Sequence, residues 1–332
     1  MTWWRTLVDA GAVAGGSGLG VWDQGETATY DTSIVEDSEL QTHAIPKSRI
    51  PNPEPRIPNP VSFLNGIERW SVVAYDGVVQ VVNAYVAAAV RRRDATGGLH
   101  TTFERSRGFA IAPLDRMTPM VRQALEQSVA DIESVPSELV EQPARYLEMI
   151  EVTVRRARAR MERELAEEAL DDLAADEWLV IDGLLSRSPD VARHPRALGV
   201  IKSHGAQFLE GRGLERALTL PAGYRTSVFA VRGGHTRTEV YSWYLRLWPW
   251  EGNDLLYGLL RIEARAHPDT VARASALSAW LWTERAPLAT PATRWDRLLY
   301  PLHHVEEYLK ARAPRDLQQR ASRMSRLPRL AS

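Results

Sequence analysis

The stretch DEWLVIDGLLSRSPDVARHPRALGVIK, residues 176–202, decides the fold predicted for this chain. A short apolar run, Trp178 to Ile181, ends at Asp182-Gly183, and a second run, Leu198 to Ile201, ends at Lys202. Short apolar runs that stop at turn residues are typical of strands buried inside a sheet. We therefore expect two neighbouring strands that place a carboxylate and an ammonium at one end of a buried sheet.

A matching feature lies upstream, where the run Ser71 to Tyr75 ends at Asp76-Gly77 and a second apolar strand candidate, Val78 to Val90, follows. If both Asp-Gly turns lie at the same edge of one sheet, Asp76 and Asp182 converge. Two carboxylates held close together are costly unless a cation lies between them, which indicates a divalent metal site. The alternative is that each Asp-Gly is only a turn that ends a strand.

Composition narrows the classes of protein that fit. The 332 residues are enough for one large or two ordinary domains. The net charge of -1 provides no global basic field, so nucleic-acid binding would depend on local patches such as Arg91-Arg92-Arg93 and the run Arg155 to Arg163. The absence of cysteine excludes disulfides and cysteine metal sites and fits a reducing compartment. Met1 to Arg5 lack the order of a secretory signal, so we expect a cytoplasmic protein with no membrane partner.

The pattern along the chain predicts three parts. The prolines of PNPEPRIPNP, residues 51–60, are incompatible with a central strand, so residues 1–62 are expected to form an arm and a linker. Residues 63–312 alternate between strand-like runs and helical periodicity, which is strongest over 137–174. This order predicts an α/β fold, a mixed sheet flanked by helices, with additional strands and helices in the C-terminal half. Residues 313–332 form a basic tail.

Six segments, taken in order, resemble the NurA family of DNA-repair nucleases, and the likeness covers the chain from about Phe63 to Arg312. The segments are Tyr75–Val79, Leu179–Leu185, Leu198–His204, Gly223–Phe229, Tyr241–Leu247 and Gly258–Glu263. Each segment alone is a weak signal, and it is their shared order that carries the resemblance.

The resemblance implies an RNase H-like fold, a homodimer and a manganese- or magnesium-dependent DNA nuclease. It also implies a partner, a HerA-type hexameric ATPase that translocates DNA during end resection. Two other functions stay open at this point. One is a catalytically inactive adaptor that keeps the fold for docking to the ATPase ring, and the other is a nuclease used in anti-phage defence.

The resemblance also implies the site. Asp76 and Asp182 match the family's metal-binding acids, and a glutamate on the helix before the second Asp-Gly strand completes the cluster. Glu164, three residues after Met161, is the preferred glutamate, with Glu162 as the alternative. Tyr300-Pro301 followed by His303 is similar to the family's tyrosine and histidine segment, with His304 as the second choice.

The implied chemistry is phosphodiester hydrolysis with two divalent cations about 3.5–4 Å apart. Asp76 would bridge the two cations, and Glu164 and Asp182 would each hold one. Lys202 could contact the scissile phosphate as a point charge, or it could be an ordinary solvated lysine. His303 could orient water or bind a metal as a neutral imidazole.

Overall fold

The computed structural model describes residues 3–14, 30–46, 60–94, 96–234, 236–287, 295–315 and 317. The run of glycines at 15–20, most of PNPEPRIPNP and most of the basic tail therefore lie outside the described residues. No helix within the described ranges is both long enough and apolar enough to cross a membrane.

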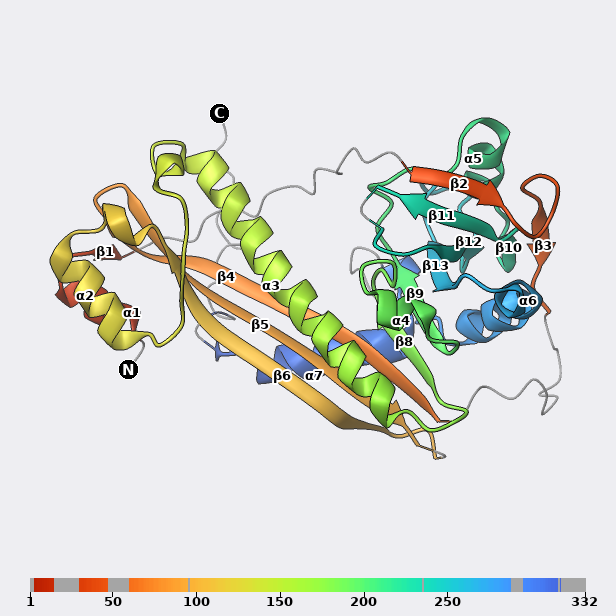
Figure 1. Ribbon diagram of the computed structural model, residues 1–332, viewed down its shortest axis with the longest axis horizontal. Helices are drawn as coiled ribbons and strands as arrows, with labels where there is room; N and C mark the ends of the chain where they lie inside the picture. Colours follow the sequence, from red (N-terminus) through yellow and green to blue (C-terminus); the bar gives the residue numbers. More distant parts are fainter. Residues whose placement is uncertain are drawn as a thin grey trace.

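A single large mixed sheet runs through the molecule (Figure 1). Its strands are β1 (Val13–Ala14), β2 (Tyr30–Ile34), β3 (Thr42–Ala44), β4 (Val61–Asp76), β5 (Val79–Arg93), β6 (Leu99–Ala112), β7 (Ile132–Ser134), β8 (Trp178–Asp182), β9 (Ala197–Ile201), β10 (Tyr224–Thr226), β11 (Phe229–Gly233), β12 (Val240–Arg246) and β13 (Leu259–Arg265). The main path through the sheet is β2-β11-β12-β13-β9-β8-β4-β5-β6-β7. The pairs β4–β8, β8–β9 and β6–β7 are parallel, and the other pairs are antiparallel.

Helices cover both faces of this sheet. The α-helices are α1 (Trp4–Asp9), α2 (Pro119–Ser128), α3 (Pro143–Asp172), α4 (Pro189–Arg193), α5 (Gly211–Leu218), α6 (Pro268–Thr283) and α7 (Tyr300–Arg312), and the 3-10 turns are η1 (Leu114–Arg116), η2 (Ser137–Leu139) and η3 (Trp295–Arg297). The long α3 lies across β4, β5 and β6, and α7 contacts β4 and β5. The buried side chains of α3 and α7 belong to separate core clusters, which places the two helices on opposite faces.

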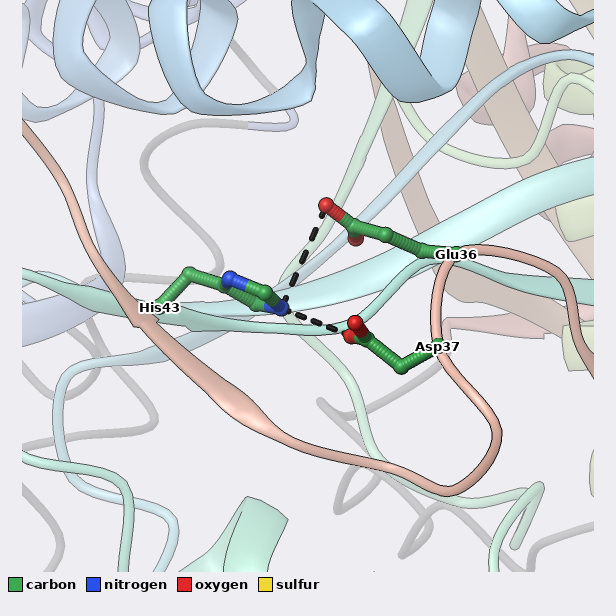
Figure 2. Close-up of side chains that lie close together, drawn as sticks. All are labelled: Glu36, Asp37 and His43. Atoms are coloured by element: carbon green, nitrogen blue, oxygen red, sulfur yellow. Dashed lines mark hydrogen bonds and ion pairs between the residues drawn. The ribbon is translucent and has the colours of Figure 1, made fainter.

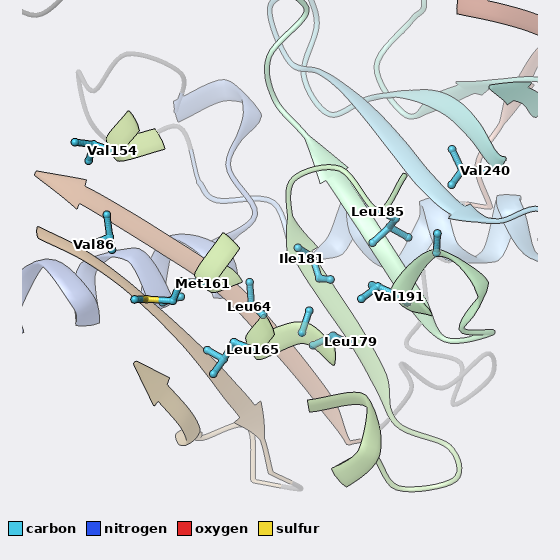
Figure 3. Packing of buried hydrophobic residues seen from close by; sticks show 14 of the residues in the cluster. Leu64, Val86, Val154, Met161, Leu165, Leu179, Ile181, Leu185, Val191 and Val240 are labelled. Atoms are coloured by element: carbon cyan, nitrogen blue, oxygen red, sulfur yellow. The ribbon is translucent and has the colours of Figure 1, made fainter. Parts of the chain in front are cut away.

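Strand β8 shows why the sequence folds in this way. Leu179 and Ile181 belong to the core cluster under α3, which Figure 3 shows at close range. Trp178 and Val180 belong to the cluster under α6 and α7. Because successive strand residues point to opposite faces, a strand covered on both faces must be apolar throughout. The predicted α/β class, with a mixed sheet flanked by helices, is therefore confirmed.

The N-terminal residues differ from the predicted arm. β2 pairs with β11, and β3 pairs with β10, so residues 30–34 and 42–44 belong to the sheet. The folded part of the chain thus begins before Phe63. The signal for this pairing is not local, because the partner strands lie more than 180 residues away in the sequence, as the 189-residue separation of Glu36 and Arg225 illustrates. Strand formation depends more on such partners than on intrinsic preference.

Candidate active site

Asp182 and Lys202 meet at one end of the sheet. β8 and β9 are parallel neighbours, and Asp182 ends β8 while Lys202 directly follows β9. The Lys202 Nζ donates to Asp182 Oδ2 at 2.5 Å, and the two side chains are only 16% and 15% exposed. The prediction that neighbouring strands place a carboxylate beside an ammonium is confirmed.

Glu162 of α3 brings a second carboxylate to this place. Its carboxylate lies against Gly66 of β4, where a Cβ atom would stand 2.4 Å from Glu162 Oε1. Gly66 therefore allows the helix carboxylate to approach the strand closely. Glu162 Oε1 is buried and has no hydrogen-bond partner among the described residues, although Arg158 Nη1 lies 3.7 Å away.

Burial dominates the electrostatics of Glu162. Removal from water raises the pKa of Glu162 to about 7, against the attraction of Arg158, and the negative charges of Asp182 and Glu68 raise it further. Lys202 acts in the opposite direction. The charges of all four groups thus act on Glu162, and its carboxyl ionises well above the usual range of a glutamate.

Arg158 and Glu68 complete the group. Arg158 Nε lies 3.2 Å from Glu68 Oε2, and the neighbouring carboxylates raise the pKa of Arg158 although burial acts against them. We call Glu68, Arg158, Glu162, Asp182 and Lys202 the strand-end cluster. β8 pairs with β4 only as far as Leu64. Beyond that point β4 continues without β8 beside it, and the cluster lies where β8 ends next to β4.

Helix α7 approaches the same place from the other face. Its Glu306 is subject to burial, which raises its pKa, but Lys310, Lys202 and His303 together lower that pKa below the usual value. His303 Nδ1 lies 4.0 Å from Glu306 Oε2. His303 is therefore near the strand-end cluster, at its margin. His304 faces elsewhere, because its Nδ1 lies 2.8 Å from Arg91 Nη1.

Asp76 does not join the cluster, and the expected convergence of Asp76 with Asp182 is wrong. Asp76 ends β4 at the tip of the β4–β5 hairpin, 12 residues beyond Leu64 and hence about 40 Å along the strand (Figure 1). Its carboxylate accepts bonds from Thr118 N at 2.6 Å and Thr118 Oγ1 at 3.3 Å. Gly77 follows with a φ of 60° and opens the hairpin turn after the paired Asp76, so Asp76-Gly77 is the strand-ending turn of the alternative interpretation.

Glu164 is also placed away from the cluster. Its side chain is 46% exposed, and it forms a loose ion pair with Arg105 of β6, at 3.8 Å. Glu162, three residues before the buried Leu165, points inward instead. Of the two glutamates weighed from the sequence, the structure therefore favours the alternative.

Sequence reasoning missed Arg158, Glu68 and the role of Gly66. Two signals were present. Asn65-Gly66 interrupts an apolar strand with two residues that strands disfavour, which marks a close approach of another group. Arg158 and Glu162 stand four residues apart on the buried stripe of α3, where charged residues are rare unless they are paired.

The loop after Asp182 is held by a buried carboxylate of β13. Glu263 Oε2 accepts from the backbone N–H groups of Leu185 and Ser186 at 2.8 and 3.1 Å, and Glu263 Oε1 accepts from Arg261 at 2.8 Å. These bonds fix the chain that leaves Asp182. They give the strand end a defined position without any side chain of the cluster.

Gly199→Ala is expected to lower stability by about 1–3 kcal/mol, because overpacking of a core strand has this cost. A Cβ at Gly199 would stand 2.6 Å from the backbone oxygen of Gly183, so the chain after Asp182 would have to move. Urea unfolding of the variant measures the loss. Gly108→Ala in the exposed part of β6, where a Cβ meets nothing within 4 Å, is the matched control and should leave the midpoint nearly unchanged. Equal midpoints for both variants would contradict the packing argument.

A second polar group consists of Glu36 and Asp37, in the loop from β2 to β3, and His43 of β3 (Figure 2). Among the described residues, it is the one group of three ligating side chains whose atoms all lie within 4.8 Å of one another. Its acids are already paired: Arg225 donates to both oxygens of Glu36 at 2.6 Å, and Ser227 donates to Asp37 at 2.5 Å. A cation would have to displace Arg225, which is 3% exposed. The group therefore holds the β2–β3 loop against β10 through the ion pair of Glu36 with Arg225.

The strand-end cluster fits a cation of a particular kind. Its donors are carboxylate oxygens, which hard divalent cations prefer, and the unpartnered Glu162 Oε1 is an oxygen that a cation would satisfy. Magnesium and manganese are commonly held by one or two carboxylates, with water and substrate phosphate as the other ligands. Glu162 and Asp182 suit that arrangement better than a cage of three protein ligands.

No protein-family model matches the chain, and no curated protein matches its sequence. The resemblance to the NurA family thus remains a prediction.

Proposed function

We propose that the chain is a divalent-metal-dependent DNA nuclease with an RNase H-like fold and that the strand-end cluster is its active site. One observation carries the proposal: Asp182, at the end of β8, is paired with Lys202, and the charges of both act on the buried carboxyl of Glu162 on α3. In open α/β sheets, ligands bind outside the carboxyl ends of parallel strands, and β8 and β9 are a parallel pair. Manganese or magnesium is the cation, and the order of segments supports DNA as the substrate.

Each residue has a distinct task in this proposal. Glu162 and Asp182 would hold the cation, and a bound cation would supply polarisation of the phosphate and an activated water. Arg158 keeps the buried site from carrying excess negative charge. Lys202 contacts the phosphate, and His303 at the margin orients water. Asp76 and Glu164 have no part in the reaction.

The direct test is cleavage of DNA by the purified protein. With millimolar manganese we expect linear and single-stranded DNA to be degraded, and chelation by EDTA should abolish the activity because the carboxylates alone provide no electrophile. Gel analysis of labelled DNA reads the result. Intact DNA after prolonged incubation with manganese, magnesium or both would overturn the proposal.

A second function has its own supporting observation. Asp182 is already paired with Lys202, and Glu68 with Arg158, so the cluster is largely neutralised by the chain's own cations. This supports a non-catalytic adaptor that docks, as a homodimer, onto a HerA-type ATPase ring. An adaptor should show the same melting temperature with and without manganese, whereas a cation that binds only the folded state raises it.

The nuclease would act the same way in end resection and in anti-phage defence. The identity of the neighbouring genes would distinguish the two roles, because defence genes around it would favour anti-phage defence.

A further inference from the structure

We infer that Lys202 is an exchangeable internal cation: it occupies Asp182 when no divalent cation is bound and is released when one binds. The inference rests on the proposed function and adds a switch to it. The released ammonium is then free to contact the phosphate of the substrate. Lys202 thereby couples cation uptake to substrate binding.

The geometry of the pair supports competition. Lys202 Nζ lies 2.5 Å from Asp182 Oδ2, so the ammonium covers an oxygen that a bound cation would need. Both side chains are largely buried, which strengthens the attraction between them and equally the repulsion between two cations at one carboxylate. Asp182 therefore holds either the ammonium or the metal ion at this oxygen.

The backbone of Lys202 is fixed, so that only its side chain has to move. Arg297 Nη1 donates to the Lys202 carbonyl at 3.1 Å, and Arg297 is itself held by Asp296 at 3.1 Å. Asp296 also accepts from the backbone N–H of Gly258 at 2.6 Å. The flexible four-carbon stem of a lysine on such a fixed base can swing without any change of the strands.

The carboxylate of Glu162 lacks a close cation among the side chains of the cluster. Arg158 approaches Glu162 Oε1 only to 3.7 Å, and this oxygen is buried with no hydrogen-bond partner in the described part of the chain. An unpaired buried oxygen costs free energy until a partner binds it. Glu306, which Lys202 already influences electrostatically, gives the released ammonium an anionic neighbour before substrate arrives.

The test is a titration of the protein with manganese in the absence of DNA. The electron paramagnetic resonance signal of free Mn²⁺ measures how much of the cation is bound. Lys202→Met keeps the stem but removes the competing charge, so the dissociation constant is expected to fall about tenfold or more relative to the wild type. Arg122→Met is the matched control, because Arg122 pairs with Glu126 on the surface of α2, outside the cluster. Its dissociation constant should equal that of the wild type.

Each outcome decides the matter. Tighter binding by Lys202→Met, or binding by this variant alone, supports the exchange. An unchanged or weaker affinity overturns it, and the nuclease proposal still stands if the wild type cuts DNA with manganese. If Lys202→Met binds manganese more tightly but no variant cuts DNA, the exchange stands and the nuclease proposal fails. Absence of binding in every variant overturns the exchange as well.

Discussion

Asp182→Asn is expected to lower manganese-dependent DNA cleavage by about 10²–10³-fold, which corresponds to about 3–4 kcal/mol of transition-state stabilisation. The amide keeps the shape of the side chain but removes the charge that would hold the cation. It also frees Lys202 from its ion pair at the end of β8. Single-turnover cleavage of labelled DNA at saturating manganese measures the change in rate.

Asp76→Asn is the matched control for this prediction. The same chemical change is made in a second Asp-Gly pair, but at the hairpin tip, where Asp76 bonds to Thr118. Its cleavage rate should stay within about twofold of the wild type, as expected for a surface change far from the reaction. A large loss in Asp76→Asn together with full activity in Asp182→Asn would place the active site elsewhere.

Glu162 is expected to make the metal-free protein less stable as pH rises. Its pKa is about 7 in the folded protein, against 4.5 for an ordinary glutamate, so the folded state keeps a proton that the unfolded chain loses. The free energy of unfolding therefore falls as pH rises from about 4.5 to about 7, by about 3–4 kcal/mol at most, and then levels off. Glu162→Gln cannot ionise and should lack this fall.

Chemical denaturation in EDTA at several pH values compares the two proteins. Near pH 5 the wild type and Glu162→Gln should have similar stability, and near pH 8 the variant should be more stable. Glu164→Gln, on the same helix but 46% exposed, is the control and should follow the wild-type profile. Parallel profiles for the wild type and Glu162→Gln would show that Glu162 is not buried as the structure has it.

Local sequence patterns were enough to predict the two central strands β8 and β9. Two short apolar runs between turn residues form strands, Trp178–Asp182 and Ala197–Ile201. Each of these strands is buried on both of its faces. Their adjacency followed from their nearness in the sequence, since consecutive strands usually lie side by side. The Asp182–Lys202 pair could therefore be expected from the sequence alone.

Register and helix phase were beyond local patterns. Asp76 and Asp182 both precede glycine, but only the pairing of β4 with β8 reveals that β4 extends far past the end of β8. Which glutamate of α3 faces the sheet depends on which side the helix presents, and Gly66 on β4 decides that by admitting Glu162. These are contacts between distant segments, and a single sequence does not specify them.

The pairing of β2 with β11 has a consequence for the time course of synthesis. Glu36 and Arg225 are 189 residues apart, so a ribosome adding about 5–20 residues per second makes the earlier residue roughly 10–40 s before its partner. During this interval β2 and β3 have neither β11 nor β10 to pair with. The strands at this edge are thus made long before their partners, and until then the nascent protein carries two unpaired strands that could associate with other chains.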